Sequence, residues 1–235
     1  MKTLKKMSAI FALMTASVVG AFAAPCQMSA TYDVFMSGGA CTVGNIEFSL
    51  FTLVSTANPN ANIIPANSIN LTLNNLIAGQ IGMQWNLGMT ASGAGNFQDT
   101  YFTFMLRGLN GLMFTGDQLS FNGSATNGGT TGVSSVVCTG GAPVNGCAPG
   151  NTYQASVFNP PVVLTDTVMF PASSIINASK DFIVAGAGSG QNVGTGQISR
   201  VNNNYFFVET AVPEPATYAL LGAGLVALGL FRKRK

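Results

Sequence analysis

The stretch TYFTFMLR, residues 100–107, decides the fold class because apolar side chains alternate along it. Phe102, Phe104 and Leu106 fall at every second position. Successive side chains of a β-strand point to opposite faces of its sheet, so these three residues define the core face of a strand. The stretch therefore predicts a central strand of a β-rich domain.

Other stretches extend this prediction to a whole domain. In NIEFSL, residues 45–50, the core face consists of Ile46, Phe48 and Leu50. No long stretch keeps an apolar period near 3.6 residues, and clusters of Gly, Asn and Pro separate the strand-like runs. The expected strands are 30–36, 46–54, 68–74, 81–89, 100–107, 118–121, 133–138, 152–158, 162–170, 180–185 and 204–210. We therefore expect one domain, residues 24–211, that is all-β and forms a single antiparallel β-sandwich of jelly-roll-like type.

The charges of the chain lie mainly at its two ends. Of ten basic residues, seven lie within residues 1–6 and 232–235, so residues 24–212 keep three basic residues against seven acidic ones, a net charge of −4. Nucleic-acid binding needs clustered Lys and Arg to replace the counterions around phosphates. We therefore exclude nucleic acid as a partner of the domain.

The N-terminus has the three parts of a secretory signal peptide. A basic segment, residues 1–6, precedes an apolar run, residues 7–20, and the small residues Ala21 and Ala23 flank Phe22. The alternative is a membrane-spanning helix, but the run is shorter than the ~20 residues that a span needs. We expect residues 1–23 to form a signal helix that is removed between Ala23 and Ala24.

The four cysteines fit the oxidising compartment that export predicts. Cys26 and Cys41 lie near the mature N-terminus, and Cys138 and Cys147 flank a loop rich in Gly, Pro and Asn. Three pairings exist, and we favour the local one, Cys26 with Cys41 and Cys138 with Cys147. The spacings do not match paired zinc thiolates and the chain contains no histidine, so we expect no metal and no cofactor.

The C-terminal stretch VPEPATYALLGAGLVALGLFRKRK, residues 212–235, also has three parts. Pro213 and Pro215, on either side of Glu214, keep the chain extended there. The apolar residues 216–231 predict a short transmembrane helix. The basic flank that follows belongs on the cytoplasmic side by the positive-inside rule and consists of Arg232, Lys233, Arg234 and Lys235.

With these three parts in this order, residues 212–235 resemble the PEP-CTERM sorting signal of Gram-negative bacteria, the substrate class of exosortase. The resemblance implies that exosortase, a membrane transpeptidase-like enzyme, recognises Glu214 and cuts near Pro213-Glu214-Pro215. It also implies an inner-membrane-anchored precursor that is then released or attached at the cell surface, often in species that make extracellular polysaccharide. A plain C-terminal membrane anchor is the alternative.

Few residues of the domain suggest catalysis. Without histidine, the chain cannot form a Ser-His-Asp or Cys-His arrangement. A glycosidase needs two facing carboxyl groups, which Asp99, Asp117, Asp166 and Asp181 can supply in principle, although solvated loop charges are the simpler interpretation. A Ser-Lys pair would have to use Lys180, which we interpret as a surface charge at a strand end.

Aromatic residues leave a carbohydrate-binding module as the alternative function. Trp85, Tyr101, Tyr153 and Tyr205 suit a sugar-stacking platform, although core or half-buried strand positions are the commoner explanation for such residues. We expect a non-enzymatic structural or interaction protein of the cell surface or extracellular matrix, with exosortase, the inner membrane and extracellular polysaccharide as its partners. A carboxylate-based hydrolase is the third hypothesis.

Overall fold

The computed structural model describes residues 23–58, 63–141, 147–188 and 194–210, together with Gly222. The expected signal helix, Ala21, the sorting motif Pro213-Glu214-Pro215, the transmembrane helix 216–231 and the basic flank 232–235 lie outside these described residues, apart from Gly222. Those expectations stay predictions.

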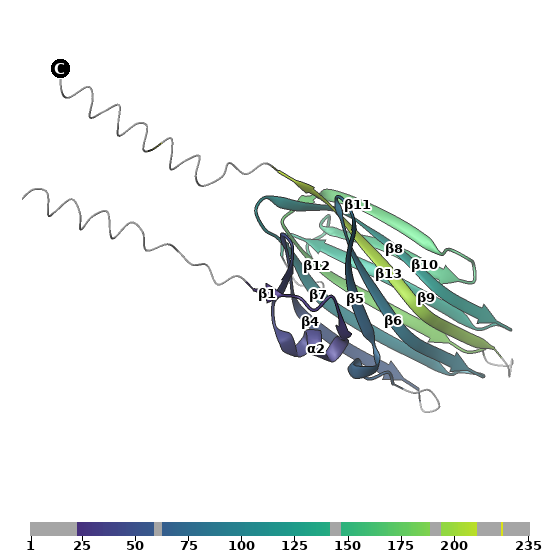
Figure 1. Cartoon of the computed structure of the whole chain (residues 1–235). Coiled ribbons are helices and arrows are strands. Elements are labelled where there is room, and N and C mark those ends of the chain that lie inside the picture. The colour runs from purple at the N-terminus through teal and green to yellow at the C-terminus, as the bar shows by residue number, and fades with distance from the viewer. Residues whose placement is uncertain (1–22, 59–62, 142–146, 189–193, 211–221, 223–235) are drawn as a thin grey trace, which may run out of the picture.

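Two facing sheets form a β-sandwich, as predicted (Figure 1). The seven-stranded sheet contains, in spatial order, β1 (Ala24–Pro25), β3 (Cys41–Val43), β4 (Ile46–Ala57), β7 (Phe97–Gly108), β12 (Ile175–Ala185), β9 (Thr130–Thr139) and β10 (Thr152–Asn159). The six-stranded sheet contains β11 (Thr165–Ser173), β8 (Leu112–Thr126), β13 (Thr195–Glu209), β6 (Gln80–Ser92), β5 (Asn70–Ile77) and β2 (Ser29–Thr31). All strand pairs are antiparallel except β1 with β3. The jelly-roll likeness stays a prediction.

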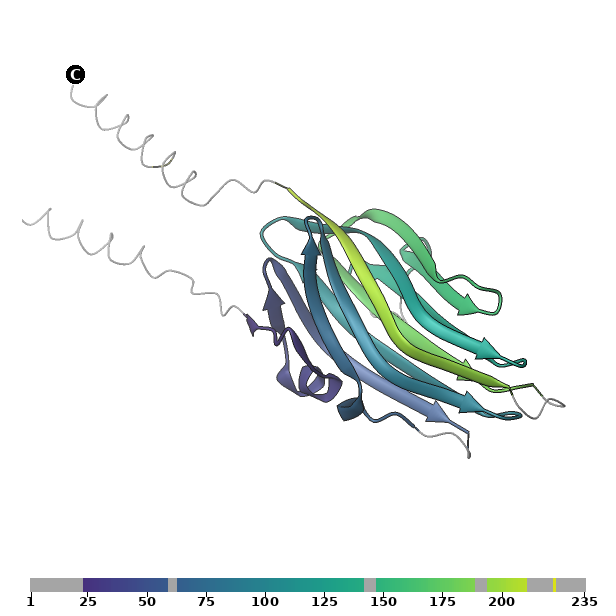
Figure 2. The same cartoon turned by 45° about the vertical axis from the view of Figure 1, so that its right-hand side comes forward.

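The long strands cross the whole sandwich, as the view turned by 45° shows (Figure 2). Inward residues of both sheets meet in one core. Trp85 of β6 packs against Phe102, Phe104 and Phe182 of the facing sheet, with ring centroids 5.9 to 6.3 Å apart. The predicted core face of residues 100–107 is confirmed, because Phe102, Phe104 and Leu106 are all buried.

The prediction for Leu50 is wrong. Ile46 and Phe48 are buried, but the side chain of Leu50 is 65% exposed and its φ is 56°. The register between β4 and β7 shifts between Ser49 and Thr52. A β-bulge adds one residue to a strand and so reverses the faces beyond it, which places Phe51 in the core instead.

The strand predicted over residues 30–36 is also wrong. Only Ser29–Thr31 are extended, and Tyr32–Gly38 form the short helix α2, while Ala66–Ser68 form the 3₁₀ helix η1. Tyr32 and Phe35, three residues apart, are buried, as the face of a helix requires. The Tyr32 ring packs against Phe102 with centroids 4.9 Å apart, so α2 covers the N-terminal edge of the core.

Candidate functional site

A group of fully buried polar side chains connects the two sheets, and we name it the Lys180 cluster. Its members are Lys180 of β12, Ser135 of β9, Asp117 of β8 and Asn203 of β13, each with no exposed surface. Lys180 and Ser135 are direct partners across the seven-stranded sheet. Asp117 and Asn203 come from the six-stranded sheet. The cluster therefore gathers an amine, a hydroxyl, a carboxylate and a carboxamide inside the core.

The Asp117 carboxylate is the centre of the Lys180 cluster. Lys180 Nζ lies 3.3 Å from Asp117 Oδ2 and also donates to Ser135 Oγ. The Ser135 hydroxyl donates to the same Oδ2 atom. Asn203 Nδ2 donates to Asp117 Oδ1 and to the carbonyl oxygen of Gln118, the latter at 2.9 Å. One carboxylate thus contacts the amine through one oxygen and the carboxamide through the other.

The surroundings of the cluster are buried and partly aromatic. Lys180 Nζ lies 5.1 Å from the centroid of the Tyr205 ring. Burial lowers the pKa of Lys180 to about 8, although the Asp117 charge and its hydrogen bond oppose this shift. Burial, with the Asp117 charge as the second cause, raises the pKa of Tyr205 well above its usual range. Asn203 Oδ1 and the Tyr205 hydroxyl are buried without a hydrogen-bond partner.

Lys180 was predicted as a surface charge at a strand end, and this is wrong. The residue lies in the middle of β12, where the inward positions also include Ala178 and Phe182. The sequence therefore contained a signal for burial. Lys180 lies two positions from each of these apolar residues, so its side chain points to the same face of the strand. Ser135 and Lys180 do form the Ser-Lys contact that sequence reasoning considered, but neither side chain reaches solvent.

The four candidate carboxylates of a hydrolase lie in three different places. Asp117 is in the core, whereas Asp99 and Asp181 adjoin each other on the outer face of the seven-stranded sheet. Burial and, next, a hydrogen bond to Asp99 raise the pKa of Asp181 to about 6. Asp166 accepts hydrogen bonds from the backbone N–H groups of Ser156 and Thr167, both at 2.8 Å. This arrangement differs from two carboxyl groups held apart on either side of a glycosidic bond.

The four aromatic candidates do not share one face. Trp85 and Tyr205 are fully buried in the core. Tyr153 packs against Phe170 with ring centroids 5.4 Å apart, and Tyr101 lies on a different strand, β7. The core interpretation therefore holds for Trp85 and Tyr205, and the four residues do not form a sugar-stacking platform.

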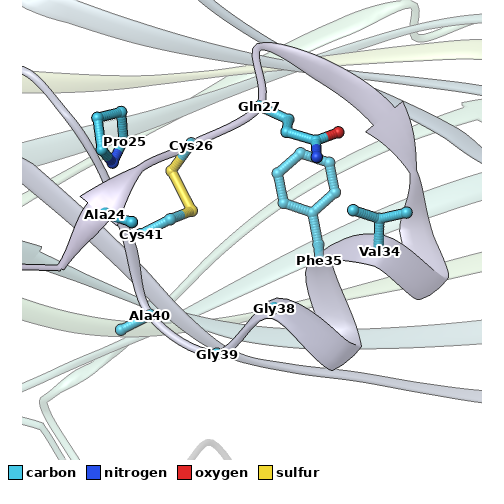
Figure 3. Close-up of a pocket in the computed structure, with 10 residues that line it drawn as sticks. All are labelled: Ala24, Pro25, Cys26, Gln27, Val34, Phe35, Gly38, Gly39, Ala40 and Cys41. Carbon is cyan, nitrogen blue, oxygen red and sulfur yellow. A yellow bond between two sulfur atoms is a disulfide. The ribbon is translucent and has the colours of Figure 1, made fainter.

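The disulfides have the predicted local pairing. Cys26 is bonded to Cys41, and Cys138 to Cys147, so all four cysteines are used. The first disulfide borders a cavity of about 180 Å³ (Figure 3). Its lining contains no charged side chain and comprises Ala24, Pro25, Cys26, Gln27, Val34, Phe35, Gly38, Gly39, Ala40 and Cys41. The cavity is smaller than the ~300–1,000 Å³ of typical ligand pockets.

Two further observations concern membrane and metal. Within the described part of the chain, none of the helices has the length and apolar character that a bilayer span requires. In the same residues, His, Cys, Asp and Glu side chains do not gather in threes close enough to hold a metal ion.

The fold and the comparisons together define the class of protein. The described domain is an all-β sandwich made of two mainly antiparallel sheets. The family model for the PEP-CTERM protein-sorting motif matches residues 211–235. The chain therefore carries this motif at its C-terminus and is an exported protein of the type that exosortase sorts. The comparison with curated proteins gave no match.

Several solved structures are similar at low scores. The enzymatically active domain of tailspike protein 4 from bacteriophage CBA120 has a TM-score of 0.29 and 14% identity, over 67% of this chain and 19% of that chain. The carbohydrate-binding module TmCBM61, solved with β-1,4-galactotriose, has a TM-score of 0.29 and 8% identity, over 67% and 88% of the two chains. A family 11 carbohydrate-binding module from Clostridium thermocellum has a TM-score of 0.22 and 12% identity, over 74% and 94%.

Proposed function

We propose that the chain is a non-catalytic structural or interaction protein of the cell surface or extracellular polysaccharide matrix of a Gram-negative bacterium. The observation that carries the proposal is the PEP-CTERM motif over residues 211–235. In this proposal the precursor is held in the inner membrane by its tail, and exosortase cuts near Pro213-Glu214-Pro215. The β-sandwich is then released or attached outside the cell.

The packing of the domain supports a structural role. Two disulfides suit an exported chain in an oxidising compartment. The polar groups of greatest chemical interest, those of the Lys180 cluster, are enclosed between the sheets, where they bind to one another. In this proposal the cluster belongs to the packed core of the domain, which supports a structural role.

The test is the intact mass of the protein recovered from the envelope and medium of its native host, with and without reduction. We expect a chain that begins at Ala24, ends between Val212 and Pro215, and is lighter by about four hydrogens before reduction. The variant Glu214→Ala should keep residues 232–235. Glu209→Ala, which changes a nearby carboxylate outside the motif, is the matched control and should be processed normally. A wild-type chain that retains Arg232 to Lys235 would contradict the proposal.

A further inference from the structure

The Lys180 cluster brings the parts of an amide-forming reaction to the two oxygens of one carboxylate. Lys180 supplies an amine and Asn203 a carboxamide, and the Asp117 carboxylate contacts both. All three side chains are fully buried. Asn203 Oδ1 has no hydrogen-bond partner, which is unusual for an amide oxygen in a core.

We propose that Lys180 and Asn203 join in an intramolecular isopeptide bond between Nζ and the side-chain carbonyl carbon, and that Asp117 promotes the reaction. The bond would link β12 of the seven-stranded sheet to β13 of the six-stranded sheet. This inference concerns a covalent modification and is independent of where the protein is delivered.

The reaction balances without a co-reactant. Asp117 takes one proton from the Lys180 ammonium, which gives a neutral amine and a carboxylic acid. The amine attacks the Asn203 carbonyl carbon, the Nζ–C bond forms, and Asp117 passes a proton from Nζ to the departing nitrogen. The C–Nδ2 bond breaks and ammonia leaves. The products are a secondary amide, ammonia and a neutral Asp117.

The environment favours each step. Burial lowers the pKa of Lys180 to about 8, so the neutral, nucleophilic amine is easier to reach than for an exposed lysine. Exclusion of water protects the carboxamide from hydrolysis. An ion pair in a core pays a large desolvation penalty, and the reaction replaces it with neutral groups. The reacting groups are also held together by the folded sheets, which removes the entropy of encounter.

Asn203 is a better acceptor than Asp117 in this geometry. An amide between Lys180 and Asp117 would use up the carboxylate that contacts the amine. It would also have to form from the carboxylate of an ion pair, with water as the leaving group. No other carboxylate contacts the Lys180 cluster among the hydrogen bonds and ion pairs of the described residues, so none would remain to move the protons. With Asn203 as acceptor, Asp117 stays available for that role.

The position of the bond matters mechanically. β13 ends at Glu209, two positions before the first residue that the sorting-motif family matches. Neither disulfide involves β13. A bond at Asn203 would therefore fix the strand that continues into the tail to the opposite sheet.

The experiment is mass spectrometry of the purified, reduced and unfolded protein after its two ends have been assigned. We expect an intact mass about 17 Da below that of the sequence, the mass of ammonia. Trypsin would cleave residues 24–210 only after Arg107, Lys180 and Arg200. Because an acylated lysine is not cleaved, the digest should contain residues 108–200 as one piece, linked to the peptide that begins at Val201.

Other masses would overturn the proposal. A loss of about 18 Da would indicate an amide between Lys180 and Asp117 and would refute the role of Asn203. An unchanged mass with free peptides on both sides of Lys180 would refute the cross-link itself.

Three variants assign the roles. Lys180→Arg removes the nucleophile, and Asp117→Ala keeps both reactants but removes the proton carrier without adding a second carboxamide beside the amine, so neither should lose ammonia. Ser135→Ala is the matched control, because Ser135 contacts Lys180 and Asp117 but contributes no reacting atom, and it should retain the loss. Ammonia loss in Asp117→Ala would refute the role of Asp117. If a variant does not fold, the intact mass and the branched tryptic peptide of the wild-type protein still test the cross-link.

Discussion

Asp99 and Asp181 form a carboxyl pair on the outer face of the seven-stranded sheet. Burial and the neighbouring Asp99 raise the pKa of Asp181 from its ordinary value of 3.8 to about 6. The folded state therefore binds more protons than the unfolded state between these two values. It follows that the stabilisation from this proton is complete below pH 4 and is lost as the pH rises through 6.

The variant Asp181→Asn should remove this loss. At pH 7 we expect its free energy of unfolding to exceed that of the wild type by about 1 kcal/mol, a value reduced for the partial exposure of the group. The difference should shrink as the pH approaches 4. Urea unfolding at both pH values measures it, and Asp99→Asn should act in the same direction. An equal difference at the two pH values would contradict the explanation.

Sequence reasoning correctly placed residues on regular strands, where every second side chain points into the core. Phe102, Phe104 and Leu106 alternate on a regular strand and are buried. Leu50 follows the same alternation but is exposed, because a bulge with a positive φ intervenes and nothing in its residue type indicates one. For the Lys180 cluster, the alternation of side chains along the strand predicts that Lys180 points inward. The sequence does not show which residues of the facing sheet contact it.

At the scale of elements, the loop from Cys26 to Cys41 encloses α2 and holds it over the core. The alternation of Tyr32 and Val34 imitates a strand, whereas the buried pair is Tyr32 and Phe35. Phe35 lies against Phe51 of β4 with ring centroids 5.3 Å apart. The short helix has no side-chain cap at Thr31, so packing and the disulfide must hold it in place.

Removal of this disulfide should weaken the domain without unfolding it. Cys26→Ala with Cys41→Ala opens a loop with a sequence separation of 15, and Cys138→Ala with Cys147→Ala one of 9. Loop-closure entropy predicts losses of about 3 and about 2.6 kcal/mol in the free energy of unfolding. Urea unfolding measures both, and hydrogen exchange should become faster in α2 only for the first pair of substitutions. Unchanged exchange in α2 would show that packing alone holds the helix.

At the scale of the whole molecule, both ends of the described domain lie at one end of the sandwich. Figure 1 shows β1 and the C-terminal end of β13 on the same side. The backbone contacts agree, because the N–H of Thr210 donates to the carbonyl of Gly111 in the turn between β7 and β8. The opposite end carries the turn between β8 and β9, since Thr126 pairs with Thr195 at the start of β13. In the proposed membrane-anchored precursor, the first end faces the membrane.

Two similar turns test this orientation. Asn110-Gly111 lies at the end that carries both termini and Asn127-Gly128 at the opposite end, and both Asn residues have a positive φ, 51° and 49°. The chain between Thr210 and Pro215 spans at most ~20 Å, which is too short for an antibody to fit beneath the domain. In spheroplasts that keep the precursor through Glu214→Ala, an epitope inserted at Asn127-Gly128 should bind antibody, whereas one at Asn110-Gly111 should bind much less. Detergent extraction should make the two equal, since it removes the membrane and leaves the turns unchanged. Equal binding before extraction would mean that the tail does not hold the domain close to the bilayer.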